Sequence, residues 1–191
     1  MKNTLESIIQ NFGELSSQEI SAGLSYFSPK SFKKNEVLIE AGSTCDWIAF
    51  VHSGILRNYY VSSKGEEVTY CLTFPNKFIT AYSSFLSGEA TFENIHAITD
   101  TEALFIKKHH YQELIDSSKS WLKFSKIFAE QSYLLMENRL LALQMESAEN
   151  RYRELITHEP QFIQHVPLKY LASYLGVTQR HLSRLRKIIS F

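Results

Sequence analysis

The most informative stretch of this sequence is LKYLASYLGVTQRHLSRLRK, which spans residues 168–187. A helix-turn-helix needs a small residue where its helices cross, a glycine that can adopt positive φ in the turn, and apolar residues that fasten the second helix. Ala172, Gly176 and Leu182 meet these needs in order, at intervals of four and six residues. The stretch therefore predicts two short helices joined by a tight turn. An ordinary helical hairpin is the alternative.

The second of these helices carries the predicted DNA contacts. Thr178 is expected to cap its N-terminus, which directs free backbone amides and the first turn toward a phosphate backbone. In the major groove, arginine can form paired hydrogen bonds with guanine, and glutamine can do so with adenine. The residues expected to contact DNA are Thr178, Gln179, Arg180, His181, Ser183, Arg184 and Lys187.

The charge distribution supports the same interpretation, although 20 basic and 20 acidic residues leave the 191-residue chain without net charge. Residues 147–191 contain seven basic and three acidic side chains, a net charge of +4, which leaves −4 on residues 1–146. No acidic residue occurs from Val166 onward. A basic terminus on a mildly acidic body indicates a nucleic-acid-binding segment. A solvated helix face is the alternative.

Upstream, the segment from Trp121 to about Met145 contains neither glycine nor proline and predicts one long helix. Ile127, Leu134 and Leu141 recur at intervals of seven residues, the spacing of a coiled-coil seam. The apolar arc around this seam is wider than one neighbour requires. We therefore expect a homodimer held by these three residues. A helix buried inside a monomer is the alternative.

The N-terminal half predicts helices followed by short strands. Residues 1–26 read as helical, with Ser16 or Ser17 as the cap of a second helix and an apolar repeat formed by Leu5, Ile8, Ile9, Phe12 and Leu15. Between residues 31 and 108, runs rich in β-branched and aromatic residues alternate with turns, which indicates a small antiparallel barrel or sandwich. The expected strands are 37–40, 47–52, 55–61, 67–74, 92–98 and 103–107, and the expected later helices are 111–117, 121–145, 148–158, 168–175 and 179–189.

Taken in this order, the segments resemble the Crp/Fnr family of bacterial transcription regulators. The resemblance rests on FKKNEVLIEAG (32–42), SGILR (53–57) and VPLKYLASYLG (166–176), and it covers about residues 5–189. The stretches NRYR (150–153) and VPLK (166–169) look like forms common in Bacteroidetes. The resemblance implies an α+β fold with three parts. These are a cyclic-nucleotide-binding-like antiparallel β-barrel of the jelly-roll (double-stranded β-helix) type over 1–117, a dimerisation helix over 118–146, and a winged-helix-like helix-turn-helix domain with a short or absent wing over 147–191.

The resemblance also implies a function. It implies a cytoplasmic homodimer that is not an enzyme and that reads a two-fold symmetric site on double-stranded DNA. RNA polymerase and an unidentified small-molecule effector are the further partners implied. No metal or resident cofactor is expected, and no apolar run of 18 residues indicates a membrane span.

One departure from the family concerns the ligand. Members that bind cyclic AMP carry a Gly-Glu pair and, about ten residues later, an Arg-Ser pair whose arginine neutralises the phosphate. Here Thr80-Ala81 and Thr91-Phe92 occupy those positions, and Gly88-Glu89 is followed by no arginine until Arg139. Because a buried phosphate without a cation is costly, we expect no cyclic-nucleotide binding. A cyclic-nucleotide-responsive regulator is the runner-up hypothesis.

A third hypothesis is a β-barrel enzyme or ligand-binding protein with a structural helical tail. A cupin-like metal site would need His-x-His on a strand, whereas His109 and His110 are adjacent and are expected to be exposed connector residues. Cys45 and Cys71 are too few for a disulfide framework or a structural zinc site. We expect them to behave as small buried hydrophobes, with a redox pair as the alternative.

Overall fold

The first two helices begin where the sequence supplies a cap. The computed structural model describes residues 1–11 and 15–189, with α1 at Lys2–Asn11 and α2 at Ser17–Ser25. The Ser16 hydroxyl accepts a hydrogen bond from the Glu19 amide, while the Glu19 carboxylate accepts one from the Ser16 amide. This reciprocal capping box identifies Ser16 as the cap. Phe12, which we expected in the first helix, lies outside the described residues.

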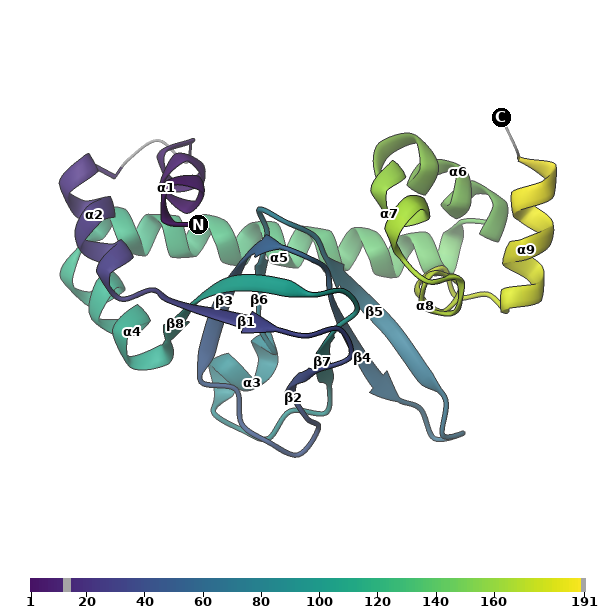
Figure 1. The fold of residues 1–191 in the computed structure, drawn as a ribbon, viewed down its shortest axis with the longest axis horizontal. Helices are drawn as coiled ribbons and strands as arrows, with labels where there is room; N and C mark the ends of the chain where they lie inside the picture. The colour runs from purple at the N-terminus through teal and green to yellow at the C-terminus, as the bar shows by residue number, and fades with distance from the viewer. Residues whose placement is uncertain (12–14, 190–191) are drawn as a thin grey trace. The chain divides into compact units, whose positions relative to one another are not determined.

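Strands among the described residues form two four-stranded sheets, whose elements are labelled in Figure 1. The strand orders are β1-β8-β3-β6 and β2-β7-β4-β5, and the pairs β1–β8, β3–β8, β3–β6, β2–β7 and β4–β7 run antiparallel. The bounds are β1 Ser28–Phe32, β2 Val37–Ile39, β3 Trp47–Ser53, β4 Leu56–Val61, β5 Glu67–Thr73, β6 Phe78–Ile79, β7 Asn94–Ala97 and β8 Thr101–Lys107. The predicted antiparallel fold is confirmed, with two sheets rather than one closed barrel.

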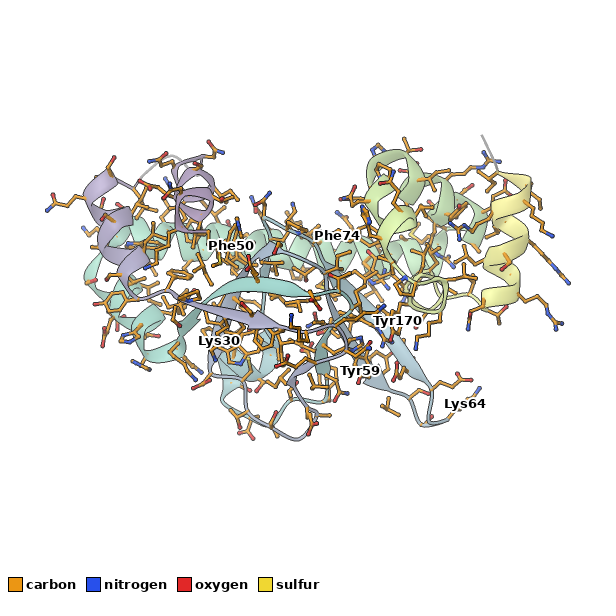
Figure 2. All side chains as sticks on the ribbon, in the orientation of Figure 1. Lys30, Phe50, Tyr59, Lys64, Phe74 and Tyr170 are labelled. Carbon is orange, nitrogen blue, oxygen red and sulfur yellow. The ribbon has the colours of Figure 1, made fainter. Side chains whose placement is uncertain are left out.

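Strand β3 is buried on both faces because apolar side chains pack on each side of it. Ala49 and Val51 belong to one core together with residues of β2, β4, β7 and β8. Ile48 and Phe50 point to the opposite face, as alternation along a strand requires, and pack in a second core that contains Trp121. Phe50 is labelled in Figure 2. Helices α3 (Tyr82–Ser87), α4 (Lys108–Ser117) and α5 (Lys119–Met145) contribute to this second core together with α1 and α2.

Several short elements were not predicted from the sequence. Strand β1 has the sequence SPKSF, with four exposed residues and no apolar alternation, and it is a strand because it pairs with β8. Strand β6 and helix α3 occupy a Ser-, Thr- and Tyr-rich segment without a clear period. Helix α7, Pro160–His165, begins at the proline that we expected to end the preceding helix, because proline is well suited to the first helical position.

The interpretation of His109 and His110 as connector residues was wrong. Both residues lie in the first turn of α4, which starts at Lys108 directly after β8 rather than at Tyr111. Their rings contact each other, with centroids 4.0 Å apart, and the His110 ring stacks on Tyr26 with centroids 4.6 Å apart. His109 is exposed as expected, whereas His110 is half-buried.

The chain divides into two compact units, residues 1–60 with 72–129 and residues 61–71 with 130–191. The second unit contains the tip of the β4–β5 hairpin, the end of α5, and helices α6 (Ala148–His158), α7, α8 (Leu168–Tyr174) and α9 (Gln179–Ile188). Strand β5 is the last strand of its sheet. The Thr69 amide donates to Ser173 Oγ at 2.8 Å, and this hydroxyl donates to the Glu67 carbonyl at 3.2 Å. A side chain of α8 thus satisfies backbone groups along β5.

Among residues 1–11 and 15–189, every helix lacks the length or the apolar character that crossing a bilayer requires.

Candidate nucleic-acid interface

Helices α8 and α9 meet at the turn that the glycine pattern predicted. Gly176 has a φ of +69°, a left-handed conformation that favours glycine. Its amide donates to the Ser173 carbonyl and the Val177 amide donates to the Ala172 carbonyl, the two hydrogen bonds of a Schellman motif. Ala172, 1% exposed, lies in the interior as the small residue that the pattern required. The local sequence therefore ends α8 and redirects the chain into α9.

Helix α9 has one buried and one exposed face. The Thr178 hydroxyl accepts a hydrogen bond from the His181 amide at 3.2 Å, which confirms the expected N-cap. Leu182 and Leu185 are buried and fasten the helix, together with Ile189 at its C-cap. Amphipathic spacing therefore leaves the polar residues of α9 on the outer side.

The exposed face of α9 collects the residues that the sequence assigned to DNA contact. Side chains tipped with nitrogen project from α9 in Figure 2. The half-buried member of the predicted set is Ser183, and the exposed members are Thr178, Gln179, Arg180, His181, Arg184 and Lys187. The face contains no carboxylate, since Glu159 is the last acidic residue of the chain. Its positive charge and capped N-terminus favour binding of a polyanion.

Not every arginine of the basic C-terminal segment lies on this face. Arg151 of α6 donates to the Leu175 carbonyl through Nε at 3.1 Å and Nη2 at 2.9 Å. Arg153 forms an ion pair with Glu149 one turn earlier in the same helix, at 2.8 Å. The net charge of the segment therefore overstates the positive charge available to a partner, and α9 carries most of that charge.

The predicted seam of α5 is largely exposed. Leu134 and Leu141 are 52% and 44% exposed, and Ile127 is half-buried. Other large apolar side chains of α5 are also exposed, namely Leu122, Tyr133, Leu135, Met136, Leu140, Leu143 and Met145. Exposed apolar residues this dense on one helix are typical of an interaction surface.

The positions that the sequence comparison predicted to correspond to the phosphate-binding pairs, Thr80-Ala81 and Thr91-Phe92, carry neutral side chains. Thr80 is 9% exposed, and its hydroxyl donates to the Trp47 carbonyl at 2.7 Å and contacts Cys45 Sγ at 3.3 Å. Ala81 is fully buried, whereas Phe92 is 64% exposed. The buried polar groups at Thr80 are thus satisfied within the protein, without a ligand.

A buried acidic group in this region was not predicted from the sequence. Glu93 is 2% exposed, and its carboxylate accepts a hydrogen bond from Asn58 Nδ2 at 2.6 Å. The Glu93 amide donates to Thr91 Oγ1 at 3.1 Å. The available signal was alternation, because Glu93 shares the period-two face of Ile95 and Ala97, both of which are buried.

The two thiols and the histidines do not form a metal site in the described part of the chain. No group of three His, Cys, Asp or Glu side chains there is arranged to hold a metal ion. Cys45 and Cys71 are both free cysteines. Cys45 is 1% exposed, as expected of a small buried hydrophobe, whereas Cys71 is half-buried.

Comparisons with known proteins concern residues 29–118 and the fold. Residues 29–118 match the family described as Cyclic nucleotide-binding domain. No curated protein matches the chain. Among solved structures, the catabolite activator protein of Thermus thermophilus has a TM-score of 0.60 at 20% identity, covering 94% of this chain and 85% of its own.

Two further structures are similar over most of their length. FixK2 from Bradyrhizobium japonicum has a TM-score of 0.74 at 17% identity, covering 85% of this chain and 84% of its own. The regulator CLP of Xanthomonas campestris, described as c-di-GMP responsive, has a TM-score of 0.71 at 15% identity, covering 91% of both chains. At these identities the likeness is one of fold.

Proposed function

Starting from a chain that contains a cyclic nucleotide-binding domain within the fold of the Crp/Fnr transcription regulators, we propose that it binds DNA as a homodimer and controls transcription. In this proposal residues 1–117 form the sensor domain, residues 118–146 the dimerisation helix and residues 147–191 the DNA-binding domain. The protein acts on DNA in the cytoplasm, without an enzymatic activity of its own, and RNA polymerase is its expected partner at a promoter.

The observation that carries this proposal is the exposed face of α9. A helix that is capped at Thr178, fastened by Leu182 and Leu185, and lined with cations on its outer side fits the major groove. Arg180 and Arg184 lie one turn apart on this side, where each can reach a guanine edge. The exposed leucines of α5 supply the two-fold pairing that places two such helices on one duplex.

The DNA sequence that the protein selects tests the proposal. Selection of bound duplexes from a random pool should yield a two-fold symmetric site, with half-sites about one helical turn, 34–36 Å, apart. Enrichment of no sequence, or of a site without symmetry, would contradict it.

Alanine variants then test the assignment of residues on α9. Arg180→Ala or Arg184→Ala should weaken operator binding by about 1–3 kcal/mol and relax the preference at one symmetric base position. Lys187→Ala should weaken binding to operator and random duplexes alike, because a phosphate contact carries no sequence information. Arg153→Ala is the matched control, since Arg153 is paired with Glu149 on α6, outside α9. If Arg180→Ala and Arg184→Ala bind both duplexes like wild type, α9 does not read the groove.

The proposal includes a sensor that does not bind cyclic nucleotide. The Thr91 position lacks the cationic side chain that a cyclic phosphate requires, and the Thr91 hydroxyl already accepts a hydrogen bond from the Glu93 amide.

A second candidate function is a cyclic-nucleotide-responsive regulator, which the family match over residues 29–118 favours. Calorimetry with cyclic AMP, cyclic GMP and cyclic di-GMP separates the two. Saturable binding of any of these at micromolar concentration would favour the second candidate.

A further inference from the structure

Two arginine side chains from outside the α8–α9 pair hold the last carbonyls of α8. Arg139 of α5 donates through Nη2 to the Tyr174 carbonyl at 2.7 Å, and its guanidinium lies 3.7 Å from the centroid of the Tyr174 ring. Arg151 of α6 donates to the next carbonyl, Leu175, through two nitrogens at 3.1 and 2.9 Å. These carbonyls immediately precede Gly176, where the chain turns into α9. The turn is therefore held by side chains that come from outside α8 and α9.

The Arg151 guanidinium also reaches the end of α5. Its Nη1 atom donates to the Glu146 carbonyl and approaches the Ala142 carbonyl at 3.5 Å. One planar group thus joins the last turn of α5 to the last carbonyl before the Gly176 turn. A guanidinium suits this role because its donors diverge in a fixed plane, whereas a lysine ammonium cannot reproduce that geometry.

Side-chain packing around Gly176 adds to the contact between the end of α5 and the turn. A Cβ atom at Gly176 would lie 3.1 Å from Leu143 Cδ2 of α5 and 3.8 Å from Arg151 Nη2. The turn is therefore close to both α5 and the Arg151 side chain, with little space for a change in angle. Arg151 is half-buried, so water competes only partly for its hydrogen bonds.

We propose that Arg151 is a positioning residue that sets the orientation of α9 relative to α5, and through it the spacing between operator half-sites. This inference rests on the proposed function. In a dimer paired along α5, the distance between the two α9 helices depends on the angle at which each leaves its own α5. When Arg151 bonds both to the end of α5 and to the Leu175 carbonyl, this angle is fixed and one half-site spacing fits. Without these bonds the angle can vary, and several spacings fit.

Replacement of Arg151 should change the preference for operator spacing more than the affinity for a single half-site. The side chains that face the groove come from α9, and Arg151 is not among them. Replacement of Arg151 should therefore leave binding to an isolated half-site within about twofold of wild type. Binding to operators of different spacing should become less selective, because binding at the preferred spacing weakens while binding at altered spacings does not.

The experiment compares full-length wild type with Arg151→Gln, Arg151→Lys and Arg153→Gln. Arg153→Gln is the matched control, since Arg153 lies two residues away on α6 and pairs with Glu149 at the surface. Dissociation constants are measured for the selected operator, for operators lengthened or shortened by one and two base pairs, and for one half-site. Thermal unfolding of each variant reports whether it remains folded.

Wild type and Arg153→Gln should prefer the selected spacing by about tenfold or more, which corresponds to about 1.4 kcal/mol. Arg151→Gln and Arg151→Lys should reduce this preference to about threefold or less while they unfold cooperatively and bind the half-site. Loss of affinity by the same factor at every spacing would show a merely structural role and overturn the inference, as would an unchanged preference. If Arg151→Gln does not fold, Arg151→Lys, which keeps the charge and the aliphatic stem, decides between these outcomes. If wild type binds none of these duplexes, the proposed function fails and the inference fails with it.

Discussion

The two halves of α5 differ in their surroundings, and the C-terminal half, which is richer in apolar residues, is the less covered of the two. In the N-terminal half, Trp121 is 5% exposed, and Phe128 contacts Phe78 and Tyr82 with ring centroids 5.4 and 6.0 Å apart. In the C-terminal half, Leu135 is 69% exposed, and other leucines around it are exposed as well. One half is covered by its own chain, whereas the other presents apolar surface to solvent. Hydrophobic spacing along a helix thus predicts that a face will be covered, but not by which chain.

A substitution that removes a buried side chain from the covered half of α5 should have the largest effect on stability. Trp121→Ala removes a buried indole from the core formed with α1, α2 and α4, and should destabilise the first unit by about 3–5 kcal/mol. Denaturant unfolding monitored by circular dichroism measures this loss. The control is Leu122→Ala, at a neighbouring side chain that is 52% exposed and should change stability far less. Equal losses for the two variants would contradict the stabilising role of the buried Trp121 side chain in the covered half.

Charge introduced into the uncovered half should act on assembly rather than on folding. Leu134→Glu would place an unpaired carboxylate in the proposed seam and weaken dimerisation by about 2–3 kcal/mol. Sedimentation at several concentrations should show a dimer for wild type and a monomer for the variant, with similar unfolding of the first unit. Gln144→Glu is the control, because it adds the same charge at an exposed polar residue of α5 outside the apolar set and should leave the dimer intact. A monomeric wild type at tens of micromolar would remove the basis for the seam.

A smaller effect is expected where α2 contacts the covered half. A Cβ atom at Gly23 would lie 2.2 Å from Cζ2 of the Trp121 ring, so Gly23→Ala forces the indole or α2 to shift. Overpacking of this kind outweighs the gain in helix propensity, and the net cost should be about 1–2 kcal/mol. Thermal unfolding should show a lower midpoint for Gly23→Ala but not for Ser21→Ala, which alters an exposed residue of the same helix. An unchanged midpoint for both would indicate that the indole moves without cost.

The smallest effect concerns pH. Hydrogen bonds from the Ser16 amide, then from the Ser118 and Ser16 hydroxyls, lower the pKa of Glu19 from 4.5 to about 2. A carboxyl with a lowered folded-state pKa stabilises the protein above pH 4.5, and this contribution is lost as the pH falls from 4.5 through about 2. Because glutamine does not titrate, Glu19→Gln should be less stable than wild type at pH 7 but similar near pH 2. Thermal unfolding across this range tests the convergence, with Glu6→Gln on α1 as the control variant.

Much of the architecture follows from local signals. Helix α6 was predicted at its observed bounds, because Pro160 marked its end, and in the structure Ser147 caps its start. Strand β1 could not be predicted, since only its pairing with β8 makes SPKSF a strand. The exposed face of α9 was predictable, because its cap, its buried leucines and its charges all lie within ten residues.

The junction around Gly176 was not predictable from the sequence. Arg139 and Arg151 bond to carbonyls that lie 35 and 24 residues away along the chain. Every residue has the same backbone carbonyl, so the sequence does not show which arginine side chain will donate a hydrogen bond to which carbonyl. The charge count therefore assigned Arg151 to the basic segment, although its hydrogen bonds are internal.

The hydrogen bonds between Ser173 and strand β5 bear on how this protein avoids aggregation. An edge strand with unsatisfied amides and carbonyls is a template on which a strand of another molecule can pair. Here the Thr69 amide and the Glu67 carbonyl are already occupied by one hydroxyl of α8. A chain cut after Met145 would keep β5 but lose Ser173, and so would expose that edge. Attempts to express residues 1–145 alone should therefore yield strand-paired oligomers unless a charged or proline substitution blocks the edge of β5.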